Sequence, residues 1–178
     1  MTTVDEDSET TFLAWNPYIN WQNGVAEYEV WLEINDNDPE LVGTTSSQSF
    51  EFLYRNDGFT YCFRIKAIEN SGNQSFSWSS LACAEFSPKV QAYNVFTPNG
   101  DQYNPTLVFD GLELYPNHEL QVLNRYGKLV FSATNYQNNW NGTLNGKLLP
   151  TGVYYFLLDL KEPRSDQQIV KGTLSILR

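Results

Sequence analysis

Side chains that could carry out chemistry are few and widely spaced. The sequence holds one histidine, His118, and two cysteines, Cys62 and Cys83. A catalytic triad needs a base beside its nucleophile, and a zinc site needs three or four clustered ligands. Neither set is available, and His118, which precedes a predicted strand in a Tyr-Pro-Asn turn, is expected to be exposed. Glycine-rich phosphate loops are also missing from the sequence. The sequence therefore predicts a protein that is not an enzyme and that needs no cofactor.

The two cysteines predict a disulfide. Cys62 opens the penultimate strand predicted for the first half of the chain, and Cys83 lies in the last one. Facing residues on neighbouring antiparallel strands have Cβ atoms about 4.5–5.5 Å apart, which a small adjustment would allow to bridge. A bridge requires an oxidising compartment, and closing this loop would contribute about 3 kcal/mol. Two free buried thiols are the alternative.

Charge is unevenly distributed along the chain. With 41% hydrophobic and 15% aromatic residues, the chain can build a core. Residues 1–88 contain 14 acidic and 3 basic side chains, whereas residues 89–178 contain 7 and 8. An acidic half would repel nucleic acid and anionic membranes. No apolar run approaches the roughly 20 residues of a membrane helix, and no signal-peptide pattern is present. The chain is interpreted as a fragment of a larger protein.

Apolar and polar residues alternate in short segments, which predicts strands rather than helices. Tyr28, Val30, Leu32 and Ile34 share one face of such a segment, and glutamates occupy the other. The predicted strands are 11–16, 26–34, 40–44, 49–54, 60–69, 79–86, 91–96, 107–109, 118–124, 129–132, 153–160 and 169–177. The chain is therefore expected to be all-β, with two tandem immunoglobulin-like β-sandwich domains at residues 1–88 and 89–178.

The first half resembles a fibronectin type III domain over roughly residues 10–86. The resemblance is carried by Trp15, by the pair Tyr28 and Val30, by Tyr61 at the start of a Tyr-x-Phe-x-Ile-x-Ala strand, and by an Asn-x-Gly turn at 70–72. It implies a tyrosine corner, in which the ring of Tyr61 packs in the core while its hydroxyl bonds back to the corner before its strand.

The second half contains an ordered set of motifs. They are Asn94-Val95-Phe96-Thr97-Pro98-Asn99-Gly100-Asp101, Tyr115-Pro116-Asn117, Leu120-Gln121-Val122-Leu123-Asn124-Arg125-Tyr126-Gly127, Val130-Phe131, Trp140-Asn141-Gly142, Leu149-Pro150-Thr151-Gly152-Val153-Tyr154-Tyr155 and Lys171-Gly172, with Ile176 and Arg178 at the end. Together they resemble the type B C-terminal sorting domain of the type IX secretion system, the module that ends many gliding-motility-associated adhesins. The resemblance covers nearly all of residues 90–178.

That resemblance implies a protein that is exported through the periplasm and the outer membrane to the cell surface or the medium. Its partners would be the type IX translocon and an outer-membrane protein of the PorP/SprF type, and the chain is expected to be a monomer. The preceding domain would belong to a cell-surface adhesin. The alternative function is a carbohydrate-binding or other adhesive module, with Tyr18, Trp21, Trp31 and Trp78 as a platform for sugar rings.

Two groups of residues in the second half are candidate sites. Asn99, Asp101 and Asn104 are weak candidates for a calcium site, because they supply too few oxygens without backbone and water, and an Asx turn is the simpler interpretation. Partner recognition is assigned to a surface patch, because the resemblance implies that the domain is recognised after folding. The residues assigned to it are Arg125, Tyr126, Gly127, Lys171 and Arg178.

Overall fold

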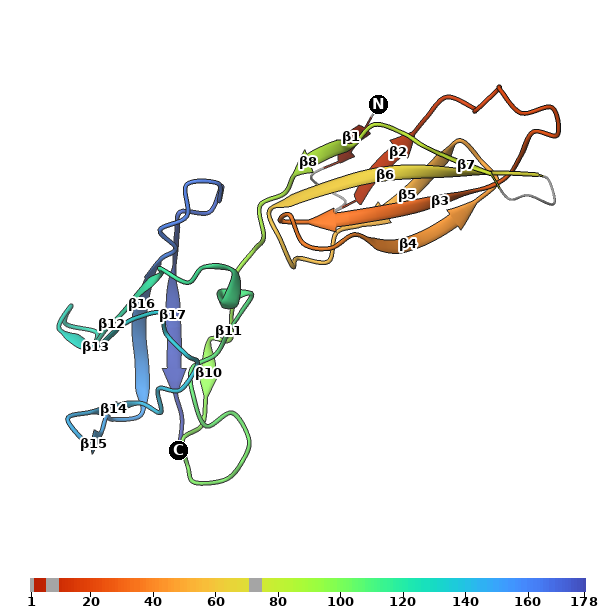
Figure 1. Cartoon of the computed structure of the whole chain (residues 1–178). Coiled ribbons are helices and arrows are strands. Elements are labelled where there is room, and N and C mark those ends of the chain that lie inside the picture. Colours follow the sequence, from red (N-terminus) through yellow and green to blue (C-terminus); the bar gives the residue numbers. More distant parts are fainter. Residues whose placement is uncertain (1, 6–9, 71–74) are drawn as a thin grey trace. The chain divides into compact units, whose positions relative to one another are not determined.

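The computed structural model describes residues 2–5, 10–70 and 75–178 of the chain. The chain divides into two compact units, Met1–Phe86 and Ser87–Arg178 (Figure 1). The division falls two residues before the predicted boundary, because Ser87 and Pro88 are held by the second unit. The hydroxyl of Ser87 accepts the N–H of Asp166 at 2.9 Å, and the carbonyl of Pro88 accepts the hydroxyl of Tyr115.

The first unit is a sandwich of two antiparallel sheets, as the alternating pattern predicts. One sheet contains β1 (Thr2–Asp5), β2 (Thr10–Ala14) and β5 (Ser49–Leu53) in that order. The other contains β4 (Glu40–Thr45), β3 (Val25–Ile34) and β6 (Thr60–Glu69), with β7 (Phe76–Trp78) and β8 (Ala82–Glu85) both paired to β6. Tyr28, Val30 and Leu32 face the core.

The predicted tyrosine corner is confirmed. Tyr61 is fully buried at the start of β6. Its hydroxyl donates to the Asp57 carboxylate at 2.5 Å and accepts the Asp57 N–H at 3.3 Å. Burial raises the pKa of Tyr61 above its ordinary value. The corner thus keeps a polar group satisfied at the edge of an apolar core.

The last predicted strand of the first unit is wrong in one respect. Of the predicted strand 79–86, residues 82–85 form β8, and β7 lies before the predicted range, with a break between the two strands. Ser79 fills the break: its N–H donates to the carbonyl of Ile65 at 2.8 Å, and its hydroxyl accepts the Ile65 N–H at 3.0 Å. A side-chain oxygen replaces a ladder carbonyl here, so the pairing is interrupted. The predicted turn at 70–72 lies, beyond Asn70, outside the described residues.

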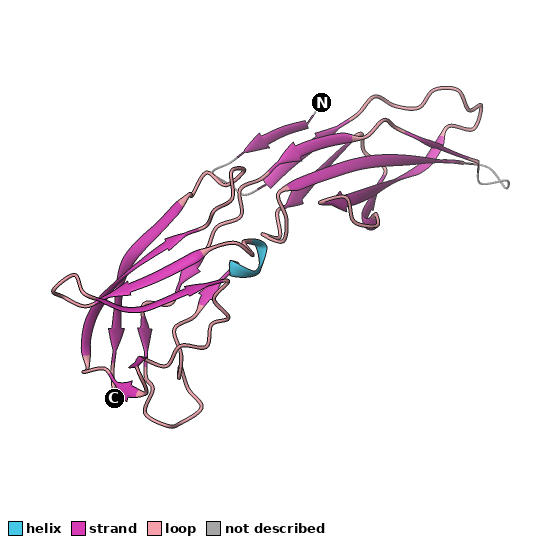
Figure 2. Cartoon of the chain, turned by 60° about the vertical axis from the view of Figure 1, so that its left-hand side comes forward, coloured by secondary structure: helices cyan, strands magenta, loops and turns pink. Residues whose placement is uncertain are grey.

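The second unit is built on one larger sheet with smaller pairs beside it. The five-stranded sheet has the order β10 (Val95–Phe96), β17 (Ile169–Ile176), β16 (Gly152–Asp159), β12 (Glu119–Leu123) and β13 (Leu129–Thr134). The smaller pairs are β9 (Gln91–Ala92) with β11 (Phe109–Asp110), and β14 (Thr143–Leu144) with β15 (Lys147–Leu148). In the described chain the one helical element is the 3-10 turn η1 (Leu112–Leu114), seen in Figure 2. The all-β prediction is confirmed.

One predicted strand, 91–96, serves two sheets. Its first part is β9, which pairs with β11, and its last part is β10, which pairs in parallel with the end of β17. Between them the N–H of Tyr93 donates to the carbonyl of Val108 at 3.0 Å, and the carbonyl of Asn94 accepts the N–H of Ser175 at 2.8 Å. The final strand is therefore not an open edge at its end.

A separate hydrophobic core lies under the five-stranded sheet. Its fully buried members include Phe96, Leu107, Phe109, Leu120, Leu158, Leu174 and Ile176. Trp140 joins this core: its ring stacks on Phe131 with centroids 4.8 Å apart, and its indole N–H donates to the carbonyl of Thr143 at 2.9 Å. The Trp-Asn-Gly motif is thus a packing element.

Candidate functional site

His118 is buried, so the prediction of an exposed histidine is wrong. Its side chain is 1% exposed. Nε2 accepts the backbone N–H of Tyr136 at 2.7 Å, which places the ring proton on Nδ1, and Nδ1 donates to the carbonyl of Tyr115. Both ring nitrogens are therefore used to tie the start of β12 to the segment after β13. In this arrangement the ring has no free nitrogen with which to take a proton from a nucleophile.

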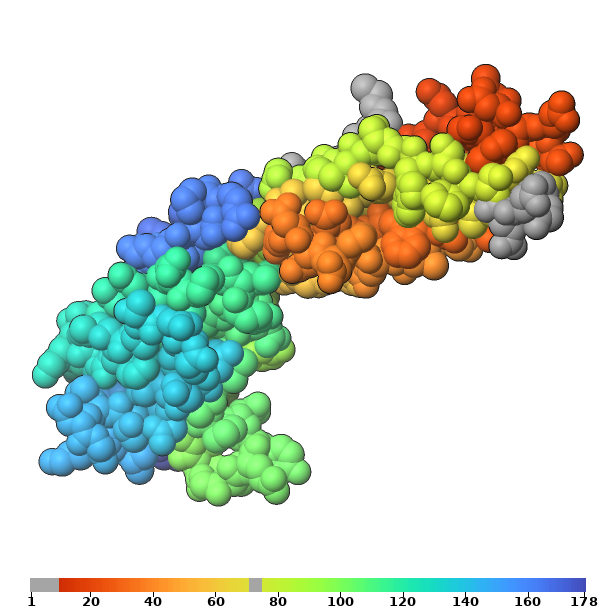
Figure 3. Space-filling view, viewed as in Figure 1, coloured from red at the N-terminus to blue at the C-terminus, as the bar shows by residue number. Residues whose placement is uncertain are grey.

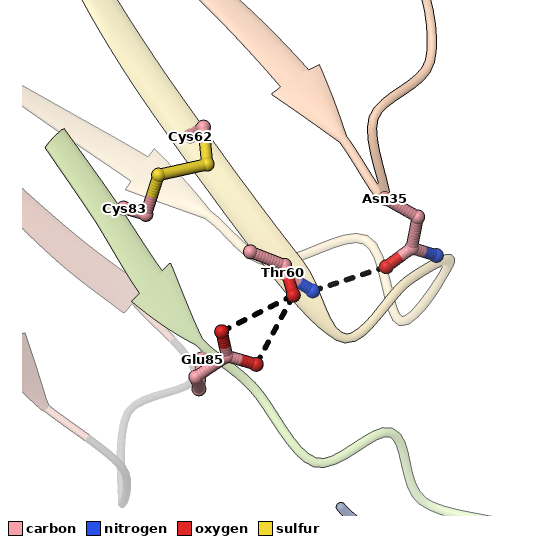
Figure 4. The surroundings of a disulfide bond; sticks show 5 residues. All are labelled: Asn35, Thr60, Cys62, Cys83 and Glu85. Carbon is pink, nitrogen blue, oxygen red and sulfur yellow. Dashed lines mark hydrogen bonds between the residues drawn. A yellow bond between two sulfur atoms is a disulfide. The ribbon is translucent and has the colours of Figure 1, made fainter. Parts of the chain in front are cut away.

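The predicted disulfide between Cys62 and Cys83 is present. The two residues lie directly opposite each other on β6 and β8, with Cα atoms 4.0 Å apart (Figure 4). Next to it Thr60 links three segments, since its N–H donates to the Asn35 side chain at 3.1 Å and its hydroxyl lies 3.1 Å from the Glu85 carboxylate. The bridge therefore closes a corner that hydrogen bonds already define.

The loop that carries the calcium candidates forms an Asx turn. Asn99 Oδ1 accepts the N–H of Asp101 at 3.0 Å, and Asp101 Oδ1 accepts the N–H of Tyr103 at 2.9 Å. The other carboxylate oxygen of Asp101 accepts Asn99 Nδ2 at 2.7 Å. Asn104 holds the loop closed through its carbonyl, which accepts the N–H of Thr97 at 2.7 Å. This loop projects from the body of the second unit (Figures 1 and 3).

The turn between β12 and β13 presents Arg125 and Tyr126 to solvent. Both side chains are exposed, and the Arg125 guanidinium lies 4.9 Å from the centroid of the Tyr126 ring. The side chain of Asn124 accepts the N–H groups of Tyr126 and Lys128 at 2.9 and 3.0 Å. Gly127 completes the turn with a φ of 75°, a conformation that glycine adopts without strain. The backbone is thus fixed while the two side chains stay available.

Arg178 has a structural role in addition to its position in the predicted patch. Its guanidinium donates to the carbonyls of Leu149 and Gly142, the second at 3.4 Å. Burial raises the pKa of Tyr154, and the charges of Arg178 and Arg125 act on the same phenol in the opposite direction. Two of the predicted recognition residues therefore lie at one end of the five-stranded sheet.

Lys171 lies farther along the sheet, on its outer face. It is exposed on β17 opposite Leu157 of β16. Its neighbour Gly172 points to the core, where an added Cβ would come within 2.9 Å of the Phe156 ring. The Lys-Gly motif therefore combines an exposed cation at Lys171 with a close approach of the Gly172 backbone to the Phe156 ring. The structure does not bring Lys171 into contact with Arg125 or Arg178.

An apolar row on the outer face was not predicted from the sequence. Residues 153–158 of β16 are apolar at every position, so the strand has apolar side chains on both faces. Tyr154 and Phe156 face the core, and Tyr155 faces outward with 48% of its surface exposed. Leu123 lies directly opposite Tyr155, and Leu129 lies opposite Leu123. This row crosses three strands.

The same face continues toward β10. Val153, two residues before Tyr155, is 53% exposed. Its partner on β17 is Ser175, which in turn lies opposite Val95 of β10. The residues Val95, Leu123, Leu129, Val153 and Tyr155 therefore lie on one face of the sheet, with Ser175 between Val153 and Val95, and we call these five residues the apolar band. A strand with apolar residues on both faces in an antiparallel sheet is the sequence signal that would have revealed it.

The aromatic residues proposed as a sugar platform do not form flat pairs. The rings of Trp31 and Trp78 meet edge to face, at 69° with centroids 5.8 Å apart. Arg64 and Lys66 each lie 5.8 Å from the centroid of the Trp78 ring. Tyr18 and Trp21, tilted by 42°, pack against the core as partly buried side chains. Sugar stacking needs an open ring face, which this arrangement does not favour.

Comparisons with known proteins give a family match for the second unit. Residues 90–176 match the model of the CHU_C type IX secretion signal domain. A search of curated proteins gives no match. A solved structure titled "Central Fibronectin-III array of RIM-binding protein" aligns with 96% of this chain and 64% of its own length, at 13% identity and a TM-score of 0.33. In the part of the chain that the structure describes, no helix has the length and hydrophobicity to span a membrane.

Proposed function

We propose that the second unit, a type IX secretion signal domain, carries the export address of a secreted cell-surface adhesin. The signal domain directs the protein to the secretion system and across the outer membrane, to the cell surface or the medium. The first unit belongs to the exported adhesin. A PorP/SprF-type outer-membrane protein recognises the folded second unit, and the exported protein is displayed on the cell.

One observation carries this proposal. The family match begins at residue 90 and ends at residue 176, and the compact unit runs from Ser87 to Arg178. The matched sequence and the folded unit therefore coincide within a few residues at both ends. A signal that coincides with a whole domain suits recognition of a folded surface, because its motifs are brought together only by folding.

The motifs of the family match the structural needs of this unit. Glycine at position 142 has a φ of 75° and packs against Ile176, where an added Cβ would lie 3.1 Å from Cδ1. Tyr154 donates its hydroxyl to the carbonyl of Pro150 at 2.8 Å. These residues define the fold, whereas exposed residues are left to contact the partner. We infer a non-catalytic role, since the one imidazole of the chain is occupied by two hydrogen bonds.

The proposal is tested by export of a reporter. A signal peptide and a fluorescent protein are placed ahead of residues 1–178, of residues 87–178, or of residues 1–86, in a host with the type IX machinery and a PorP/SprF-type protein. We expect the first two fusions to reach the surface or the medium and the third to stay in the periplasm. Retention of both fusions that contain residues 87–178 would refute the proposal. Export without the PorP/SprF-type protein would refute only the choice of partner.

A further inference from the structure

The outer face of the five-stranded sheet carries more apolar side chains than a solvent-exposed face needs. In antiparallel sheets with one face on the core, the other face is usually polar. Here the apolar band runs across β13, β12, β16 and β10, and reaches Val95 through Ser175. Contiguous exposed apolar surface of this kind marks interaction sites. Tyr155, near the middle of the band, is a residue type enriched at binding hot spots.

The cations on this face lie at two places, in the turn at one end of the band and on β17, where Lys171 is one row from Asp159. The turn that joins Leu123 to Leu129 carries Arg125 and Lys128, and Lys171 lies on the same face opposite Leu157. Lys161 and Arg164 make ion pairs in the described part of the second unit, whereas Arg125, Lys128 and Lys171 make none there.

The carboxylates of the face lie at its other end and are already paired. Glu119 and Asp159 are opposite each other on β12 and β16, and Lys161 lies 3.6 Å from the first and 2.7 Å from the second. The positive rim of the band is therefore uncompensated, whereas the negative end is neutralised. A complementary surface would be apolar at its centre and acidic at its rim.

We infer that the apolar band, with Arg125, Lys128 and Lys171 at its rim, is the surface on which the outer-membrane partner docks, through an apolar patch bordered by carboxylates. This inference rests on the proposed function and specifies the surface on which it depends. Arg178 is not part of the docking surface, because its guanidinium is engaged by the carbonyls of Leu149 and Gly142. The cations guide and orient the encounter, and burial of the band supplies the affinity.

The test uses the full chain with the double substitution Val153→Ser and Tyr155→Ser. The matched control is Tyr93→Ser, since Tyr93 is 52% exposed, close to the 48% of Tyr155, but bonds to Asp110 of the β9–β11 pair, which is not part of the five-stranded sheet. Both variants should melt within about 5 °C of the unsubstituted chain, because exposed cross-strand pairs contribute little to stability. We expect reporter export by the double variant to be at least tenfold lower than by the unsubstituted chain, and export by the control to be normal.

A second arm places a photoreactive phenylalanine analogue at position 155 or 93 of the full chain, in cells with a tagged PorP/SprF-type protein. Crosslinking to the tagged protein from position 155 and not from 93 is expected.

Arg125→Glu should reduce export, and Arg125→Lys should retain it. Normal export of the folded double variant would overturn the inference and leave the proposed function intact. Retention of the unsubstituted chain would refute the proposed function, and the inference with it.

Two further outcomes would replace the partner with another occupant. If the unsubstituted chain sediments as a dimer that the double variant cannot form, the band binds a second copy of this chain. If the chain floats with vesicles of anionic lipid and the double variant does not, the band binds a membrane surface. Either result overturns docking on an acidic protein.

Discussion

The backbone N–H of Tyr136 donates to Nε2 of His118 at 2.7 Å, deep in the second unit. The same histidine donates through Nδ1 to the carbonyl of Tyr115. One side chain thus satisfies two backbone groups from segments that lie on either side of the β12–β13 hairpin. In the second unit, the histidine therefore has a structural role.

The substitution His118→Phe should destabilise the second unit. It keeps an aromatic ring of similar size but leaves the buried N–H of Tyr136 without an acceptor, which costs about 1–3 kcal/mol. The Tyr115 carbonyl loses the ring donor but keeps the backbone N–H of residue 118 at 3.1 Å. Thermal unfolding of the full chain would measure the loss. The control is Lys171→Ala at an exposed position, which should stay within about 0.5 kcal/mol. A His118→Phe chain as stable as the unsubstituted one would show that water satisfies the Tyr136 N–H.

Removal of the Cys62–Cys83 bridge should destabilise the first unit. The 21-residue separation of the cysteines corresponds to about 3 kcal/mol in the chain-entropy model. The double substitution Cys62→Ser and Cys83→Ser should therefore lower the unfolding midpoint of the first unit and leave that of the second unchanged. Mass analysis of protein made in the periplasm should find no alkylatable thiol before reduction. Two free thiols in that sample would contradict the bridge.

Alkaline pH should destabilise the second unit through Tyr136. Burial raises the pKa of this phenol to about 12, and its hydroxyl donates to the carbonyl of Leu107 at 2.7 Å. In the unfolded chain a tyrosine ionises near pH 10. The contribution of the Tyr136 phenol to the free energy of unfolding is complete below pH 10. It is lost as the pH rises from 10 toward about 12, because in this range the phenol is ionised in the unfolded chain but still protonated in the folded one.

The expected slope is about 1.4 kcal/mol per pH unit for this one group. Urea unfolding at several pH values between 9 and about 12 would measure this slope. In Tyr136→Phe the slope should be smaller by up to about 1.4 kcal/mol per pH unit, the contribution of one ionising group. That variant also loses two hydrogen bonds, so its stability at neutral pH is the reference for the comparison. Equal slopes in both proteins would assign the alkaline loss to other tyrosines.

The loop of Asn99 and Asp101 should not need calcium. Its side-chain oxygens already accept N–H groups, and a calcium ion requires 6–8 oxygen ligands. Calcium or a chelator should therefore leave the melting temperature of the full chain unchanged, whereas Asp101→Ala should lower it slightly by removing two acceptors. A rise of the melting temperature with calcium that Asp101→Ala abolishes would restore the calcium site.

Most strands of both units were predictable, but the short strands β1, β14 and β15 and the continuity of strands were not. Alternation identified β3 and β6 almost to the residue, since one face of each is buried. The break at Ser79 and the switch of sheets between β9 and β10 were not predictable, because both depend on hydrogen bonds to residues distant in sequence, such as Ile65 and Ser175.

For the candidate site residues, the exposure of a side chain could be predicted where it depended on neighbours in the sequence. Arg125 lies in a short turn whose exposure follows from the hairpin itself. The sequence around His118 resembles an exposed turn, but its burial follows from the chain after β13, where Tyr136 lies. The outward position of Tyr155 was concealed by a strand that is apolar on both faces. The burial of His118 and the outward position of Tyr155 depend on contacts with segments distant in sequence, which the sequence pattern does not reveal.

Arg178 provides the last prediction, because the structure separates its packing role from partner recognition. Its guanidinium donates to the carbonyls of Leu149 and Gly142 and so fastens the end of the described chain to the segment before β16. Arg178→Ala should cost about 1 kcal/mol, the usual net contribution of such hydrogen bonds. Export should fall only as far as stability falls, and a stabilising osmolyte should restore both. Arg125→Glu should show the opposite pattern, with normal melting and poor export that the osmolyte does not rescue. If Arg178→Ala melts normally and fails to export, Arg178 contacts the partner directly and the docking surface extends to this end of the sheet.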